Sequence, residues 1–279
     1  MLINALRTGS KVIKNMKEII YTIPILMSLV SASFADIDRA KQAFDEGDYN
    51  YAYDEYLMDA ENGHPEAQFY MGVLYFNGVG TKKDLTEALR WYKLSARKGF
   101  PIAQHSIANM YEIGVGVEQN YQEAFNWYKK AAVQGLRSAQ YSLGEMFRNG
   151  TGVDKDEIEA AKWTIKAAES DHALAQYNLS ILYDLGIGVA VDKAKSREWT
   201  ERAAMLGVAN AQYNLAAFYI NGQVSVGNLI SAHQWFTISQ RSGHKQAAEG
   251  KATLEEYMPA EDIAEAIKRA DIWFAERRK

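Results

Sequence analysis

The sequence AQYNL occurs twice, at residues 175–179 and 211–215, and the two copies lie 36 positions apart. Alanine occupies six positions at this spacing, and tryptophan occupies five, so that only one of the six tryptophans falls outside the pattern. These residues are Ala67, Ala103, Ala139, Ala175, Ala211 and Ala247, with Trp91, Trp127, Trp163, Trp199 and Trp235. A fixed period of this length indicates a repeat architecture. It runs from about residue 40 to the C-terminus.

One repeat, residues 67–99, predicts two helices joined by a short loop. Small or apolar residues follow helical spacing in its first part, and Gly78-Val79-Gly80 then interrupts the pattern with two residues that can adopt a positive φ. Asp84 predicts the N-cap of the second helix, and Glu87 completes the sequence of a capping box. Gly99 predicts its end in the left-handed conformation. The repeating unit is therefore a helical hairpin.

A single hairpin of this size cannot bury its apolar faces, so successive hairpins must stack into a solenoid. The predicted fold class is all-α. The alanine positions allow helices to approach closely, and the tryptophans fill the space between layers. The predicted divisions are a capping hairpin at residues 36–63, five repeats of 36 residues at 64–243, and capping helices at 244–279.

The repeat resembles the Sel1-like repeat, a relative of the tetratricopeptide repeat. Its pattern, AxxxLxxxYxxGxGVxxDxxxAxxWxxxAAxxG, is most complete in residues 103–135, and the resemblance covers nearly all of the chain after residue 36. The resemblance implies a right-handed α/α superhelix that serves as an adaptor or scaffold, often in the bacterial envelope, in signalling or in host interaction.

Residues 1–35 are predicted to be a secretory signal peptide. Lys11, Lys14 and Lys17 precede an apolar run of twelve residues at 19–30, and SASFA follows it. This order matches a basic region, a short apolar core and a small-residue cleavage site, predicted after Ala35. The run is too short to span a bilayer, so we expect a periplasmic or secreted protein without stable membrane insertion after cleavage. An uncleaved amphipathic anchor is the alternative.

Composition excludes several classes of function. The chain contains no cysteine, which removes disulfides, thiol nucleophiles and thiolate metal sites. Its formal net charge is −4, and no concentrated basic face is present, so nucleic acid is not an expected partner. Three of the five histidines, His64, His172 and His244, share one turn position in non-consecutive repeats. We therefore interpret them as structural residues and predict no metal site and no cofactor.

Candidate catalytic groups are few. Ser95-Ala96-Arg97-Lys98 matches the S-x-x-K of penicillin-recognising enzymes, but Ser95 occupies a column that is otherwise alanine and the accompanying motifs are absent. Asp154, Asp156, Glu157 and Glu159 crowd one turn, which is typical of a solvated loop or of a weak calcium site. The sequence predicts a protein that is not an enzyme.

Three positions of the first helix lie beside its core stripe and vary between repeats. In stacked hairpins the first helices line the concave wall, so these positions and a neighbouring aromatic column predict a groove that offers amides and tyrosine edges to an extended peptide. Solvated positions without a ligand are the alternative interpretation. The predicted groove residues are Tyr70, Asn109, Tyr141, Glu145, Tyr177, Asn178, Ile181, Tyr213 and Asn214.

The sequence thus predicts an exported, non-enzymatic scaffold that binds a protein or peptide in its concave groove. Two alternatives from other classes stay open: an enzyme of β-lactam or peptidoglycan chemistry, and a glycan-binding envelope protein that uses the tyrosines.

Overall fold

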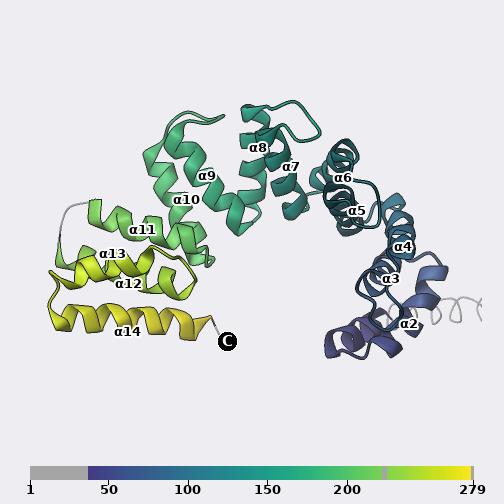
Figure 1. Cartoon of the computed structure of the whole chain (residues 1–279), viewed down its shortest axis with the longest axis horizontal. Coiled ribbons are helices and arrows are strands. Elements are labelled where there is room, and N and C mark those ends of the chain that lie inside the picture. Colours follow the sequence, from purple (N-terminus) through teal and green to yellow (C-terminus); the bar gives the residue numbers. More distant parts are fainter. Residues whose placement is uncertain (1–36, 222–224, 278–279) are drawn as a thin grey trace, which may run out of the picture. The chain divides into compact units, whose positions relative to one another are not determined.

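The structure, a computed structural model, describes residues 37–221 and 225–277. Within those ranges all regular secondary structure is helical, which confirms the predicted all-α class (Figure 1). The predicted signal peptide, residues 1–35, lies outside the described residues. The chain divides into two compact units between Gln119 and Asn120.

The helices follow one another as antiparallel hairpins, and within each unit neighbouring helices pack together. The first unit contains a helix over residues 37–46 followed by α2 (Tyr49–Glu61), α3 (Pro65–Asn77), α4 (Leu85–Arg97) and α5 (Pro101–Ile113). The second contains α6 (Tyr121–Val133), α7 (Arg137–Asn149), α8 (Glu157–Glu169), α9 (Ala173–Leu185), α10 (Lys193–Met205), α11 (Ala209–Asn221), α12 (Val226–Arg241), α13 (Ala247–Glu255) and α14 (Ala260–Glu276).

The second helix of a repeat begins at the predicted N-cap. Asp84 Oδ1 accepts hydrogen bonds from the backbone N–H groups of Thr86 (2.9 Å) and Glu87 (3.0 Å). The prediction of a complete capping box is wrong. The Asp84 N–H donates to Tyr75 O (2.9 Å), back on the first helix, and Glu87 pairs with Arg90 instead. The N–H that a capping box would satisfy is thus already used to close the hairpin loop.

The two glycines of the loop have different neighbours. The first, such as Gly150 (φ 69°), ends the first helix, which is the usual position of a left-handed glycine. The second, such as Gly152 (φ 70°), lies against the start of the preceding second helix, where an added Cβ would overlap the carbonyl of Tyr121. Gly188 meets Glu157 in the same way. The loop therefore needs glycine both for its backbone angle and for close approach.

The core confirms the predicted alanine column, whereas the tryptophan column is only partly buried, since Trp127 and Trp199 are half-buried. Ala139, Ala175 and Ala211 are fully buried, and Trp163 and Trp235 are 7% and 8% exposed. A column of buried glutamines joins the layers, since each donates its Nε2 to a carbonyl in the last turn of the preceding second helix, as Gln176 does to Ala168 (3.1 Å). The five are Gln68, Gln104, Gln140, Gln176 and Gln212.

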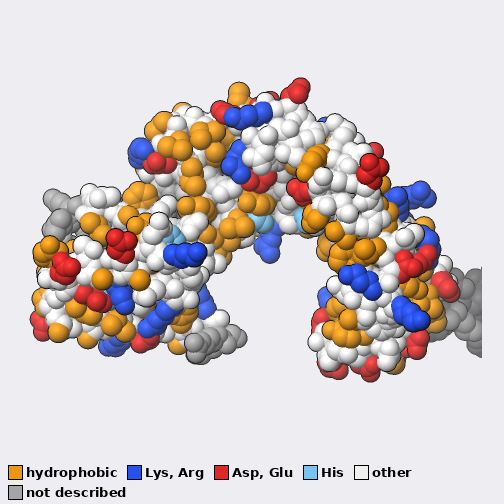
Figure 2. All heavy atoms as spheres, in the orientation of Figure 1, with side chains coloured by type: hydrophobic (Ala, Val, Ile, Leu, Met, Phe, Trp, Pro, Cys, Tyr) orange, Lys and Arg blue, Asp and Glu red, His pale blue; other side chains and the backbone are white. Residues whose placement is uncertain are grey.

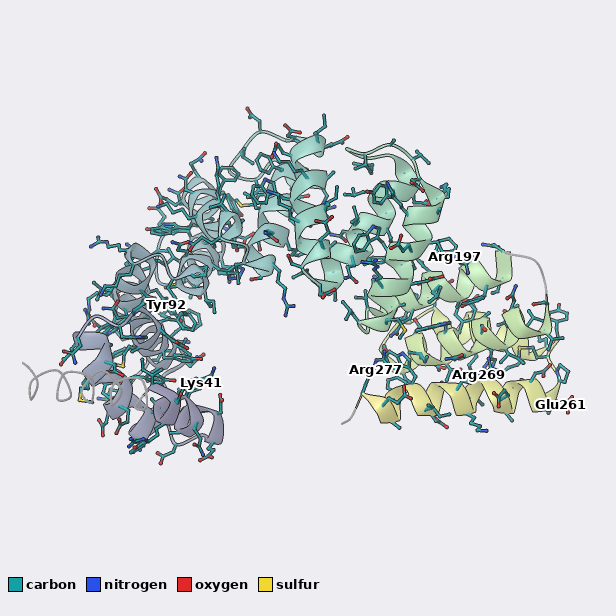
Figure 3. The ribbon with its side chains drawn as sticks, turned by 180° about the vertical axis from the view of Figure 1, so that it is seen from behind. Lys41, Tyr92, Arg197, Glu261, Arg269 and Arg277 are labelled. Atoms are coloured by element: carbon teal, nitrogen blue, oxygen red, sulfur yellow. The ribbon has the colours of Figure 1, made fainter. Side chains whose placement is uncertain are left out.

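The helix α14 closes the C-terminal end of the second unit. It begins one residue after Pro259, which occupies the N-cap position. Trp273 packs edge-on against Trp235, with 6.3 Å between ring centroids. Arg277, labelled in Figure 3, lies 3.9 Å from the Trp273 ring and donates to Met205 O (3.1 Å). Cation–π and backbone contacts therefore fix the end of this helix.

Candidate functional site

All nine predicted groove residues are half-buried. Seven of them lie in the second unit on its first helices, which carry what we call the α7–α9–α11 face. The remaining two lie in the first unit. The seven are Tyr141 and Glu145 on α7, Tyr177, Asn178 and Ile181 on α9, and Tyr213 and Asn214 on α11.

Two pockets of about 290 Å³ each open on the α7–α9–α11 face. The first lies between α7, α8 and α9, and the second between α9, α10 and α11. Ile181 contributes to both and forms their common wall. Residues that line the first include Glu145, Arg148, Thr164, Asn178 and Leu182, and residues that line the second include Asp184, Leu185, Thr200, Asn214 and Phe218.

The first unit holds a smaller pocket of about 180 Å³ at the equivalent place in its own repeats. Tyr92 and Asn109 line it. Tyr70 does not, because its ring stacks on Tyr56 of α2 with 4.7 Å between centroids and also contacts Phe44. The first hairpin therefore covers the Tyr70 ring, and burial raises the pKa of its hydroxyl.

The predicted tyrosine column lies beside the pockets and does not line any of the three. The Tyr141 ring stacks on His172 (4.5 Å between centroids), and Tyr213 stacks on His244 (4.3 Å). Tyr177 packs against the apolar cluster that contains Ala211 and Leu215, as Val208 also does. The Tyr141 and Tyr213 rings thus hold α7 and α11 to the turn that precedes α9 and α13, respectively. Their covered faces leave little surface for a sugar to stack upon.

The turn histidines have structural contacts. His172 Nδ1 accepts from the Ala175 N–H (3.2 Å) and so caps α9. Burial, and then the Arg137 charge, lower the pKa of His172, and burial lowers the pKa of His244. Among the described residues no group of three or more histidine, aspartate or glutamate side chains is placed to hold a metal ion.

Polar contacts link the first helices across the first pocket. Asn178 Nδ2 on α9 donates to Glu145 Oε1 on α7 (3.2 Å), and Glu145 also accepts from Arg148 Nε (3.0 Å). Burial raises the pKa of the nearby Tyr141, while the Asn178 hydrogen bond opposes this rise. The amide of Asn178 is therefore already engaged within the protein.

Ser95 does not pair with Lys98 in the way that a catalytic serine–lysine pair requires. Its buried hydroxyl donates to Pro65 O (2.6 Å), and Lys98 Nζ donates to Gly63 O. Ser239, at the same position of the last repeat, bonds to Ala209 O in the same way (2.8 Å). The hydroxyl in this column replaces an alanine and ties two helices together.

Sequence reasoning missed the second-helix contribution to the pockets, namely Thr164 and Thr200. Both occupy a column that is otherwise aromatic, with Tyr92, Tyr128 and Phe236. The change from aromatic to threonine in two consecutive repeats was the available signal.

No described helix is long and apolar enough to cross a bilayer. The stacked hairpins, with their Gly-x-Gly loops and buried alanine columns, define an α-helical repeat protein of the solenoid class. The Sel1 repeat model matches residues 65–100, 101–136, 137–172, 173–208 and 209–244, and the chain belongs to the Sel1 repeat family.

Solved structures agree with this assignment. The chain is similar to c5321, a protective antigen of uropathogenic Escherichia coli with an SLR fold (31% identity, TM-score 0.73), over 87% of this chain but only 53% of that one. It is also similar to a Sel1 repeat protein from Oxalobacter formigenes (28% identity, TM-score 0.71), over 87% of this chain and 98% of that one. No curated protein matches the sequence.

Proposed function

We propose that the protein is a non-enzymatic scaffold that binds another protein or an extended peptide on its α7–α9–α11 face. Sel1-repeat solenoids are generally protein-interaction scaffolds. The observation that carries the proposal is the pair of pockets that open side by side on this face, lined by Glu145, Asn178, Ile181 and Asn214. A chain segment that crosses the face can use both pockets at once.

Site-specific photo-crosslinking in the producing cell tests this function. A photoreactive amino acid replaces Asn178 on the α7–α9–α11 face, and the matched control replaces Glu169, which is exposed on α8. We expect a discrete protein adduct from position 178 and none from position 169. Equal labelling at both positions, or none at either, would contradict the proposed binding face.

We further propose that the protein is exported and cleaved after Ala35. Support comes from the three lysines that precede the apolar run at residues 19–30. N-terminal sequencing of protein from the envelope or medium should begin at Asp36. Leu26→Arg, which places a charge in the apolar run, should retain the uncleaved chain inside the cell. Recovery of uncleaved wild-type chain from the cytoplasm would refute export.

A further inference from the structure

We infer that the two neighbouring pockets form a two-subsite cradle for an extended segment that carries two uncharged aliphatic side chains, one for each pocket. This inference rests on the proposed function and specifies the chemistry of its partner. Three observations support it: the threonine floors of the pockets, the pairing of every charge that lines them, and the amide of Asn214, which makes no hydrogen bond to any described residue.

Both pockets have a threonine on the second helix where other repeats carry an aromatic residue, and this exchange enlarges them. In the first unit the Tyr92 ring, labelled in Figure 3, lies over Gly72, where an added Cβ would overlap it. In the second unit Gly144 faces Thr164 instead. The equivalent pockets measure about 180 Å³ with tyrosine and about 290 Å³ with threonine. A missing ring thus leaves space for a side chain from elsewhere.

The threonine floors offer no free hydrogen-bond donor. Thr164 Oγ1 donates to Ala160 O (2.8 Å) and Thr200 Oγ1 donates to Ser196 O (2.9 Å), each within its own helix. Ile181 adds an aliphatic wall to both pockets. A side chain that enters therefore finds mainly apolar contacts, which favours an aliphatic residue.

Every charge that lines the two pockets already has a partner. Glu145 pairs with Arg148, Lys155 with Glu157 (2.9 Å), and Asp184 with Lys193 (2.8 Å). In the view of Figure 2 the surface over α9 and α11 is mainly uncharged, whereas charged side chains crowd over α14. A charged side chain would lose water here without gaining a counterion. Complementarity of charge therefore requires an uncharged occupant.

The size of each pocket favours a side chain over a free small molecule. Each lies just below the roughly 300–1,000 Å³ typical of small-molecule sites. Because the pockets share the Ile181 wall, one chain can fill both. The first helices α7 and α9 are in side-chain contact, since Asn178 donates to Glu145 (3.2 Å), and helices in contact lie about 8–10 Å apart. Three residues of polyproline II span about 9 Å and return to the same face of the peptide. The two side chains are therefore expected at positions i and i+3.

Asn214 supplies a contact for the main chain of this segment. Its amide is half-buried and makes no hydrogen bond within the described part of the protein. At the equivalent position Asn178 is held by Glu145, but Ile181 takes the place of that glutamate beside Asn214. An asparagine amide offers both a donor and an acceptor, which suits a peptide group.

The test uses the full chain and fluorescein-labelled peptides of about twelve uncharged serine, threonine and glutamine residues, with two leucines one to five positions apart. Fluorescence anisotropy should show the tightest binding for the i, i+3 pair, and an affinity at least about tenfold lower when either leucine becomes glutamate. A flat response to separation would overturn the inference.

Two variants locate the binding. Thr164→Tyr rebuilds the tyrosine-over-glycine packing of Tyr92 and Gly72, so the variant should fold and narrow the first pocket from about 290 Å³ toward the 180 Å³ of its tyrosine-lined equivalent. We expect about a tenfold loss of affinity, whereas Thr164→Val, which keeps the pocket open, should bind like wild type. Ile181→Glu tests the wall that the two pockets share. Glutamate is the residue at the equivalent position 145 of the preceding repeat, and its charge should weaken binding of the peptide. Unchanged binding by folded Thr164→Tyr and Ile181→Glu would refute the site.

Other occupants give different results. Two prolines between the leucines preserve polyproline II but prevent a helix, so loss of binding to that peptide would indicate a helical partner and overturn the inference. Self-association that Thr164→Tyr abolishes would indicate a second copy of the chain and also overturn it. If the position-178 crosslinker captures a protein but no peptide binds, the proposed function stands and this inference falls.

Discussion

At the scale of single residues, the loops combine two distinct demands on glycine. Gly207 (φ 91°) has a positive φ and no atom within 4 Å of an added Cβ, so only its backbone angle requires glycine. Gly188 (φ 67°) has a positive φ and also lies against Glu157 O and Ala161 Cβ. The second demand arises from hairpin stacking, which is absent from an isolated hairpin.

Replacing Gly207 or Gly188 by alanine distinguishes the requirement for a positive φ from the requirement for close packing. Gly207→Ala should lower the free energy of unfolding by about 1–2 kcal/mol through backbone strain alone. Gly188→Ala should cost about 1–3 kcal/mol more, because the new methyl group must displace a packed backbone. Urea denaturation followed by tryptophan fluorescence measures both. Equal losses would mean that the loop of this repeat does not pack closely against α8.

His172 makes the stability of the second unit depend on pH. Burial, and then the Arg137 charge, lower the pKa of His172 in the folded protein below the ordinary histidine value of about 6.5, so the unfolded chain binds more protons in the window between the two values. The resulting stability is present above about pH 6.5 and is lost as the pH falls through the native pKa. Protonation would also remove the Nδ1 acceptor that caps α9.

Replacing His172 by asparagine, which can also cap a helix, removes this titration. We expect the free energy of unfolding of wild type to fall more than that of His172→Asn between about pH 7.5 and about pH 5.5. Urea unfolding at the two pH values measures the difference. If the free energy of unfolding of both proteins falls by the same amount between the two pH values, His172 does not contribute to the pH dependence of stability.

At the scale of elements, local sequence rules predicted the hairpins well and their contacts less well. Caps and loop glycines act within a few residues, so Asp156 and Gly150 are readable from the sequence alone. The pockets depend on which second-helix column faces the next repeat, and so Thr164 and Thr200 were missed. The covered face of Tyr141 likewise depends on His172, 31 positions away, folding back over the ring.

Asp156 provides a test of the caps. Its Oδ1 accepts from the N–H groups of Ile158 (2.9 Å) and Glu159 (3.0 Å), so Asp156→Ala should lower the free energy of unfolding by about 1 kcal/mol. Glu159 contacts Lys162 (2.7 Å), so Glu159→Ala should cost no more than about 0.5 kcal/mol. Thermal denaturation measures the stability of both variants. A loss of stability for Glu159→Ala larger than about 0.5 kcal/mol would indicate that Glu159 does take part in a capping box.

At the scale of the whole molecule, each hairpin depends on its neighbours for burial, which is typical of repeat proteins. Sequence periodicity predicted this dependence and the need for caps at both ends. It could not show which contacts seal the last repeat. In the structure Trp273 covers Trp235, and Ala266 and Ala270 of α14 are fully buried beside it. The closing helix is therefore part of the core of the second unit.

Removal of α14 tests this role. A chain that ends at Tyr257 should expose Trp235 and the adjoining apolar cluster, and it should form oligomers or aggregates in size-exclusion chromatography with light scattering. The matched control, Glu261→Gln, changes an exposed residue of the same helix and should elute like wild type. Peptide binding should survive Glu261→Gln, because the pockets lie on α7 to α11. A truncated chain that stays monomeric, with an unchanged tryptophan emission maximum, would show that α14 covers no essential part of the core.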